Sequence, residues 1–295
     1  MDLHQFRGSI VALVTPFKSD GSVDLKALKN LVEFQIKNGT DAISPCGTTG
    51  EAPTLSDEEF EAVVGTVVET VKKRVPVIAG AGSNATAKAI KLSQKAEELG
   101  ADGILSVGPY YNKPTQEGFY QHFKAIAESV EIPILLYNVP GRTGSNMETK
   151  TVVRLAKIPN IFGMKEASAS IPQMMDLIRS KPDDFRVYSG DDAFTLPLVA
   201  CGGDGIVSVA ANEIPKQMKQ LTEAALQGDY TKACAIHYRY LPLMNANFTE
   251  SNPIPVKCAL AMMGLIQENY RLPMIPISDE NRKKLQTILK ELELI

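Results

Sequence analysis

Short hydrophobic runs alternate with longer amphipathic segments through the first 228 residues of the chain. The runs are rich in valine, isoleucine and leucine and lack regular polar alternation, a pattern typical of parallel strands buried on both faces. Each run precedes a segment in which hydrophobic residues recur with helical spacing. We predict eight strands, at residues 10–15, 41–45, 76–80, 103–107, 133–137, 161–165, 185–189 and 205–209.

Capping signals mark the ends of several predicted helices. Asp24 precedes one amphipathic segment and Gly39 follows it, while Ser56 and Glu59 form a capping-box pattern at the start of the next. We predict helices at residues 24–37, 56–74, 84–99, 115–129, 148–156, 171–180, 193–201 and 214–226, followed by helices without strands at 229–247, 254–267 and 279–292.

Eight strand–helix units predict a (β/α)8 TIM barrel, an α/β fold. We assign residues 1–228 to a catalytic barrel and residues 229–295 to a C-terminal helical extension. No GxGxxG motif follows the first strand, which argues against an open dinucleotide-binding sheet.

The composition and charge of the chain argue against several classes of protein. The 295 residues are 44% hydrophobic and 22% charged, as in ordinary globular proteins, and a net charge of −3 gives no basic surface for nucleic acid or anionic membrane. The four cysteines form no CxxC pair, so we expect neither a disulfide framework nor a zinc knuckle. Residues 1–7 lack the features of a signal peptide, and we expect a cytoplasmic protein.

Lys165 ends the predicted buried strand at residues 161–165. A buried ammonium group is costly, so such a lysine is either paired or favours its neutral form. Lowering the pKa from ~10.4 toward 7 costs about 4 kcal/mol and gives an amine able to form a Schiff base with a carbonyl. The alternative is a lysine that reaches the rim or pairs with an acid such as Glu166. Both interpretations remain open on fold grounds alone.

Active sites of TIM barrels lie at the carboxyl ends of the strands. Tyr137 ends the strand before that of Lys165, where a phenol could transfer a proton. Thr48 and Thr49 follow the second strand in a glycine-rich turn that suits a carboxylate, and Arg142 lies on a nearby loop. A core tyrosine, an ordinary turn and a solvated arginine are the respective alternatives.

The residues at the other strand ends argue against metal, hydrolase and phosphate sites. His4, His122 and His237 lie away from them, which argues against a histidine-rich metal site or a histidine-dependent hydrolase. Asp191 and Asp192 follow the seventh strand, where their charge would oppose the phosphate that many barrels bind there. We therefore expect a substrate that carries a carboxylate and not a phosphorylated sugar.

The loops together resemble those of the dihydrodipicolinate synthase family, related to N-acetylneuraminate lyase and other pyruvate aldolases. The resemblance covers essentially the whole chain. It is carried by Gly47-Thr48-Thr49-Gly50-Glu51, Pro109-Tyr110-Tyr111-Asn112-Lys113-Pro114, Tyr137-Asn138-Val139-Pro140-Gly141-Arg142-Thr143-Gly144, Gly163-Met164-Lys165-Glu166-Ala167 and Asn252-Pro253-Ile254-Pro255-Val256-Lys257.

The resemblance implies a Schiff-base lyase that condenses pyruvate with L-aspartate 4-semialdehyde, without a cofactor, in lysine and diaminopimelate biosynthesis. It implies a cytoplasmic homotetramer in which Tyr111 reaches a neighbouring subunit's site. The implied catalytic residues are Lys165, Tyr137, Thr48 and Tyr111, and the implied substrate-binding residues are Thr49, Arg142 and Val207.

One departure concerns regulation. Feedback-inhibited members of the family bind L-lysine at an interface, and the matching positions here are Asp57, Phe60, Asn84, Lys88 and Tyr110. Lys88 stands where the family has a glutamate and would repel an incoming ammonium group. We therefore predict weak or absent inhibition by L-lysine.

Two alternatives to the synthase activity stay open at this point. A sibling aldolase would act on a sugar acid or another aldehyde, although the loop that carries Arg142 argues against it. A barrel that only binds a keto acid would have no need for both Lys165 and Tyr137.

Overall fold

The computed structural model describes residues 6–295. Its eight parallel strands are hydrogen-bonded in the order β2-β1-β8-β7-β6-β5-β4-β3. A parallel bridge between Ile43 and Val77 joins the two ends of this order, so the sheet closes on itself. The predicted TIM barrel is confirmed. The strands are β1 (Gly8–Ala12), β2 (Ala42–Ser44), β3 (Ile78–Gly80), β4 (Gly103–Val107), β5 (Ile134–Asn138), β6 (Ile161–Glu166), β7 (Arg186–Ser189) and β8 (Gly205–Ser208).

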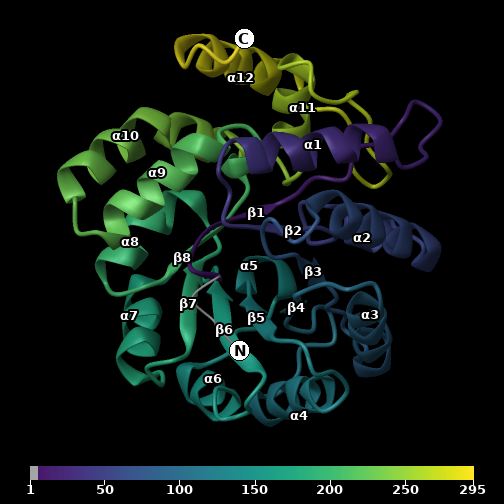
Figure 1. Ribbon diagram of the computed structural model, residues 1–295. Coiled ribbons are helices and arrows are strands. Elements are labelled where there is room, and N and C mark those ends of the chain that lie inside the picture. The colour runs from purple at the N-terminus through teal and green to yellow at the C-terminus, as the bar shows by residue number, and fades with distance from the viewer. Residues whose placement is uncertain (1–5) are drawn as a thin grey trace.

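Helices surround the strands (Figure 1). Those of the barrel are α1 (Leu25–Lys37), α2 (Asp57–Val71), α3 (Thr86–Glu98), α4 (Gln116–Ala127), α5 (Pro140–Thr143), α6 (Thr149–Leu155), α7 (Ile171–Ser180), α8 (Thr195–Ala200) and α9 (Pro215–Leu226), with 3-10 turns η2 (Ala52–Thr54), η3 (Asp192–Phe194) and η4 (Ala210–Asn212). After them come α10 (Tyr230–Ala246), α11 (Ile254–Met262) and α12 (Asp279–Glu291).

Several capping residues act as the sequence predicts. The Asp24 side chain accepts a hydrogen bond from the amide of Ala27, and Ser56 and Glu59 form a complete capping box. Such caps satisfy amides at helix starts that have no partner within the helix.

The structure differs from the prediction at some element ends. β1 stops at Ala12, short of residue 15, because the amide of Val14 donates to the side chain of Asn212 and so leaves the sheet. α11 ends at Met262, short of residue 267, and Gly264 has a left-handed φ of 74° in the turn that follows. The short helix α5 lies in a segment predicted as a loop.

Alternation along the strands divides the apolar core in two. One set of side chains, including Ile10, Leu135 and Tyr188, packs inside the barrel, and a larger set packs between the strands and the helices. Because successive residues of a strand face opposite sides, the odd-numbered residues of β5, such as Leu135, point into the barrel. This alternation also places Tyr137 inside the barrel.

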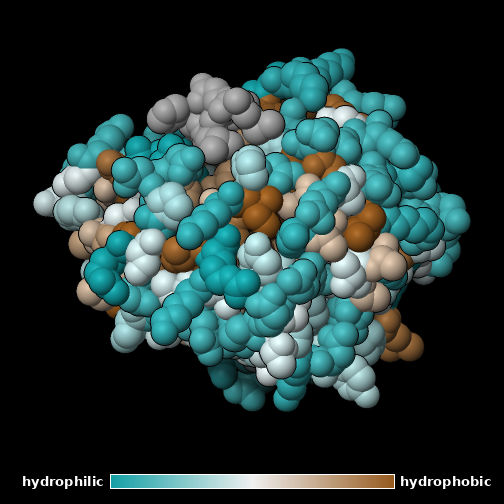
Figure 2. Space-filling model, turned by 90° about the horizontal axis from the view of Figure 1, so that it is seen from below, coloured by the Kyte–Doolittle hydropathy of each residue, from teal (hydrophilic) through white to brown (hydrophobic). Residues whose placement is uncertain are grey.

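The outer surface is mainly polar on the side shown in Figure 2, where hydrophobic side chains form separate small groups. Within residues 6–295, no helix combines the length and apolar character needed to cross a membrane.

Candidate active site

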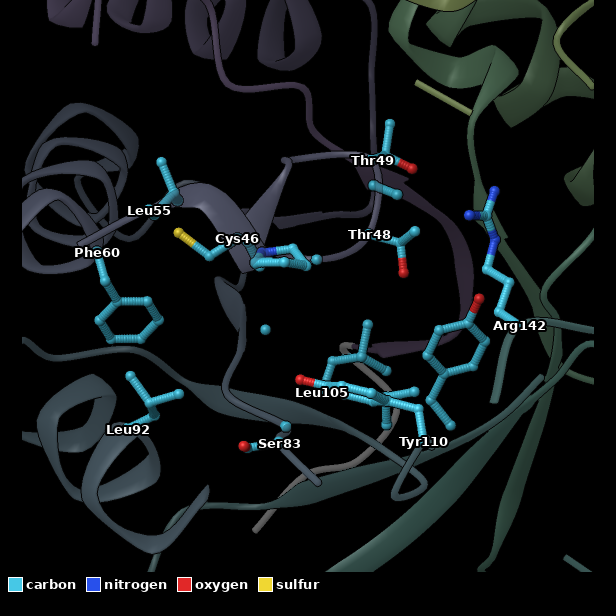
Figure 3. A pocket seen from close by; sticks show the side chains of 18 of the residues that line it. Cys46, Thr48, Thr49, Leu55, Phe60, Ser83, Leu92, Leu105, Tyr110 and Arg142 are labelled. Atoms are coloured by element: carbon cyan, nitrogen blue, oxygen red, sulfur yellow. The ribbon is translucent and has the colours of Figure 1, made fainter. Parts of the chain in front are cut away.

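A cavity of about 260 Å³ lies at the carboxyl ends of the strands. Five of the seven side chains assigned to the site from the sequence line it: Thr48, Thr49, Tyr137, Arg142 and Lys165. Figure 3 shows Thr48 and Arg142 at one end of the cavity, whereas the apolar side chains of Leu55, Phe60 and Leu92 lie at the other. The side chains of Thr48, Thr49 and Arg142 thus lie together, away from this apolar group.

Lys165 stands on β6 with its side chain inside the barrel, and only 5% of it is exposed. Its Nζ atom lies 4.3 Å from the centroid of the Tyr137 ring, on the neighbouring strand. Among residues 6–295, no carboxylate oxygen lies within ion-pair distance of Nζ. Glu166 faces the opposite side of β6, so the predicted alternative of a pair between these two residues does not occur.

The pKa of Lys165 is lowered to about 8, mainly by burial; the carboxylates of Asp192 and Asp191 oppose this shift, and the Arg142 guanidinium adds to it. The amine is therefore neutral in about a tenth of the molecules at pH 7, compared with well under a thousandth for an unperturbed lysine. A neutral amine carries the lone pair that attacks a carbonyl carbon.

The Lys165 side chain has room in the cavity because residue 190 is a glycine. A Cβ atom at Gly190, in the loop after β7, would lie 3.0 Å from Lys165 Cε and 2.6 Å from the Cβ of Ala167. The missing side chain at this position leaves room for the lysine stem to extend into the cavity.

Tyr137 lies at the end of β5, and its Cα pairs with that of Lys165 across the sheet. Burial raises the pKa of the phenol to about 12, and Arg142 and the hydroxyl of Thr48 oppose this shift. The phenol is thus protonated at neutral pH and can donate a proton to a neighbouring group.

The turn after β2 holds both threonines. Gly50 is needed in it because a Cβ there would meet the backbone of Cys46 at 3.0 Å and of Leu13 at 3.1 Å. The hydroxyl of Thr15 donates to the carbonyl of Gly50 at 2.7 Å, and the Asn252 amide donates to the Thr49 hydroxyl at 2.9 Å. The turn is therefore fixed from both sides.

Arg142 supplies a positive charge at the entrance. It lies on α5, and its Nη2 donates to the carbonyl of Asn252 at 3.4 Å. One residue of the C-terminal segment thus contacts both Thr49 and Arg142. The sequence alone gave Asn252 no role, although it belongs to one of the quoted motifs.

A buried ion pair beneath the same turn is a feature that the sequence did not predict. Lys257 Nζ donates to Glu51 Oε1 at 2.5 Å, and neither side chain is more than 2% exposed. Lys257 also lies 4.2 Å from the centroid of the Phe17 ring. A lysine within the apolar run of α11 was the available signal, but its partner lies 206 residues away.

One of the two acids after β7 is also held by hydrogen bonds within the fold. The Asp192 carboxylate is buried and accepts hydrogen bonds from Ser208 and from the amides of Val209 and Ala210. Burial raises the pKa of Asp192 to about 6. Its role in this structure is to join the loop after β7 to the end of β8.

The remaining assigned residues lie outside the cavity lining. Val207, on β8, packs in the apolar cluster inside the barrel together with Tyr137. Tyr111 is 90% exposed and has a left-handed φ of 72°, whereas its neighbour Tyr110 lines the cavity. The two tyrosines thus point apart, as the sequence predicts.

Within residues 6–295, no group of three or more histidine, cysteine, aspartate or glutamate side chains is placed to hold a metal ion.

Comparison with known proteins agrees with this geometry. The model of the dihydrodipicolinate synthetase family matches residues 5–292. A 4-hydroxy-tetrahydrodipicolinate synthase from Koribacter versatilis is 58% identical over 288 residues, which is 97% of this chain and 96% of the relative.

Solved structures give the same result. A chloride-inhibited dihydrodipicolinate synthase from Acinetobacter baumannii, solved in complex with pyruvate, is 49% identical with a TM-score of 0.96, covering 98% of this chain and 99% of its own. A structure described as the first monomeric dihydrodipicolinate synthase variant is 46% identical with a TM-score of 0.97, covering 99% of this chain and 98% of its own.

Proposed function

This chain belongs to the dihydrodipicolinate synthetase family, and from that premise we propose that Lys165 is the nucleophile of a lyase that condenses pyruvate with L-aspartate 4-semialdehyde. The product is 4-hydroxy-tetrahydrodipicolinate, an intermediate in lysine and diaminopimelate biosynthesis. The observation that carries the assignment of Lys165 is a buried amine with no carboxylate partner among residues 6–295, in a cavity that also contains a phenol and a guanidinium.

The reaction starts when the lone pair of Lys165 Nζ attacks the keto carbon of pyruvate. Loss of water from the resulting carbinolamine gives an imine, and loss of a methyl proton gives an enamine. The enamine carbon bonds to the aldehyde carbon of the second substrate. The amino group of that substrate then attacks the imine carbon, so the ring closes and Lys165 leaves as the free amine.

Tyr137 is the proton donor and acceptor in these steps. Its hydroxyl is on the strand next to Lys165, and its raised pKa keeps it protonated until a basic group forms beside it. Thr48, which interacts with the phenol, extends the path along which the proton travels.

Thr49 and Arg142 bind carboxylates in this proposal. The Thr49 hydroxyl and the amides of the turn hold the pyruvate carboxylate, with Val207 packed behind the same pocket. The Arg142 fork at the entrance holds the carboxylate of the semialdehyde.

Tyr111 completes the proton path in a neighbouring subunit of a homotetramer. Its 90% exposure in the isolated chain supports this proposal, because a side chain that points away from its own cavity is free to enter another. We also propose that the enzyme acts in the cytoplasm.

L-Lysine inhibits this enzyme weakly or not at all in our proposal. Lys88 is exposed on the rim of the cavity, and Asp57 is already paired with Lys91 at 2.6 Å. A titration with L-lysine should leave the rate essentially unchanged, and strong inhibition would contradict this proposal.

The activity is tested by following product formation with two aldehydes in turn. With pyruvate and L-aspartate 4-semialdehyde we expect turnover, whereas N-acetylmannosamine should give none. Preference for the sugar would support a sibling aldolase. Binding of pyruvate without turnover of either aldehyde would support a barrel that only binds a keto acid.

A further inference from the structure

The ends of β5 and β6 carry two matched pairs of residues. Tyr137 pairs with Lys165 across the sheet, and the next register position pairs Asn138 with Glu166. Because side chains alternate along a strand, the first pair faces the cavity and the second faces the surrounding helices. Polar residues in that second position need an explanation, since this side of the sheet is packed with apolar side chains.

Asn138 and Glu166 are hydrogen-bonded to each other and are fully enclosed. Asn138 Nδ2 lies 3.1 Å from Glu166 Oε2, and the two residues are 2% and 0% exposed. The Glu166 carboxylate also accepts hydrogen bonds from the amide of Ser168 at 2.6 Å and from the side chain of Gln173, on α7, at 3.2 Å. Burial raises the pKa of Glu166, and these donors oppose the shift.

The Asn138 side chain also forms hydrogen bonds to residues other than Glu166. Its Oδ1 accepts from the amide of Met147 at 3.0 Å, and its Nδ2 also donates to Asn146 at 2.8 Å. The orientation of the amide is therefore fixed by one donor and two acceptors. A shift of either strand would leave several of these buried groups unpaired.

We propose that Asn138 and Glu166 are positioning residues, which fix the ends of β5 and β6 so that Tyr137 and Lys165 stay at matching heights in the cavity. Neither side chain touches the substrate, because both face away from the cavity. Their contribution is geometric, and displacement of a reacting group by about 1 Å costs up to ~100-fold in rate.

The proposal, which rests on the proposed role of Lys165, is tested by exchanging donor and acceptor across the pair. Glu166→Gln places an amide against the donors of Asn138 and Gln173, and Asn138→Asp places two carboxylates together. Each single variant should form the pyruvate imine about tenfold more slowly, measured by borohydride quenching over time. The double variant N138D/E166Q restores a donor–acceptor pair and should recover to within about threefold of the unaltered enzyme.

A matched control variant distinguishes an effect on the position of Lys165 and Tyr137 from a general loss of protein stability. Asp204 is another buried carboxylate, at the amino end of β8, where it accepts from the amide of Val187 and pairs with Arg186. Asp204→Asn should lower the melting temperature but leave the rate of imine formation and its pH profile unchanged. If the Glu166 and Asn138 variants behave in the same way, or if the folded double variant stays as slow as the single variants, the proposal is overturned.

A milder variant covers the case in which the single substitutions prevent folding. Gln173→Met removes one donor to Glu166 from a half-buried position and should slow imine formation by about threefold. An unchanged rate in this variant would then overturn the proposal. If the unaltered enzyme forms no imine at all, the proposed function fails instead, so the two failures are distinguishable.

Discussion

Lys165 and Lys257 are both buried lysines near the mouth of the barrel, but their surroundings differ. Lys257 has the Glu51 carboxylate 2.5 Å away and the faces of Phe17 and Tyr270 beside it. Lys165 has the Tyr137 ring beside it, but among residues 6–295 no carboxylate forms an ion pair with it. The first is a charge stabilised by its partner, and the second is an amine whose charge is disfavoured.

This difference explains how one fold uses the same residue type in two ways. Burial lowers the pKa of both amines, and at Lys257 the Glu51 carboxylate opposes the effect directly. An amine that stays charged cannot attack a carbonyl, so Lys257 is suited to hold the turn of Thr48 and Thr49 in place. Lys165, with its pKa near 8, is suited to chemistry.

The largest expected effect comes from removing the reactive amine. Lys165→Met should lower kcat by about 10⁴-fold or more, because no other group in the cavity can form the imine. Steady-state kinetics with pyruvate and L-aspartate 4-semialdehyde measure this loss. A residual rate within tenfold of that of the unaltered enzyme would contradict the claim that Lys165 is the nucleophile and Lys257 is not.

Removing the paired lysine should act on stability. Lys257→Met leaves the buried Glu51 carboxylate without a partner and should lower the free energy of unfolding by about 3–5 kcal/mol. Urea denaturation of the single variant measures this change. The double variant E51Q/K257M should recover most of the loss, since no uncompensated charge remains, and a double variant as unstable as the single one would contradict the ion-pair account.

Lys165→Met should have the opposite effect on stability. The pKa of Lys165 is about 8 when folded and 10.5 in the unfolded reference, so the folded chain binds fewer protons between these values and its stability rises with pH across that range. The charged lysine therefore destabilises the fold below pH 8. Lys165→Met should be more stable by about 3 kcal/mol at pH 7, with the gain fading as pH approaches 10.5. Denaturation at several pH values tests this, and a variant less stable at pH 7 would refute it.

The smallest expected effect is the pH dependence of imine formation. Below pH 8 the neutral fraction of Lys165 falls about tenfold for each pH unit, so the rate should fall with it and level off above pH 8. Rapid quenching with borohydride at saturating pyruvate gives the profile. A rate independent of pH between 6 and 9 would show that the resting charge of Lys165 does not limit the reaction.

The barrel and the position of Lys165 were predictable because both depend on local pattern. Uninterrupted apolar runs show the strands, and their ends must meet at one edge of the barrel, so Tyr137 and Lys165 were expected to be neighbours. The geometric part of that prediction is confirmed by the pairing of their Cα atoms.

The supporting contacts were not predictable for a physical reason. Glu51 and Lys257 are 206 residues apart, and Asn252 reaches Thr49 across 203 residues, so no local periodicity records these contacts. The outward pair of Asn138 and Glu166 was hidden because a polar residue at a strand end is equally compatible with the cavity. The role of Tyr111 depends on a second subunit and stays a prediction.

The central claim is that only one of the two buried lysines is a nucleophile. Incubation with pyruvate and borohydride, followed by digestion and mass analysis, traps the imine as a secondary amine and locates it. We expect one adduct per chain, on Lys165, with Lys257 unmodified. No adduct on Lys165, or an adduct on Lys257 instead, would contradict the account.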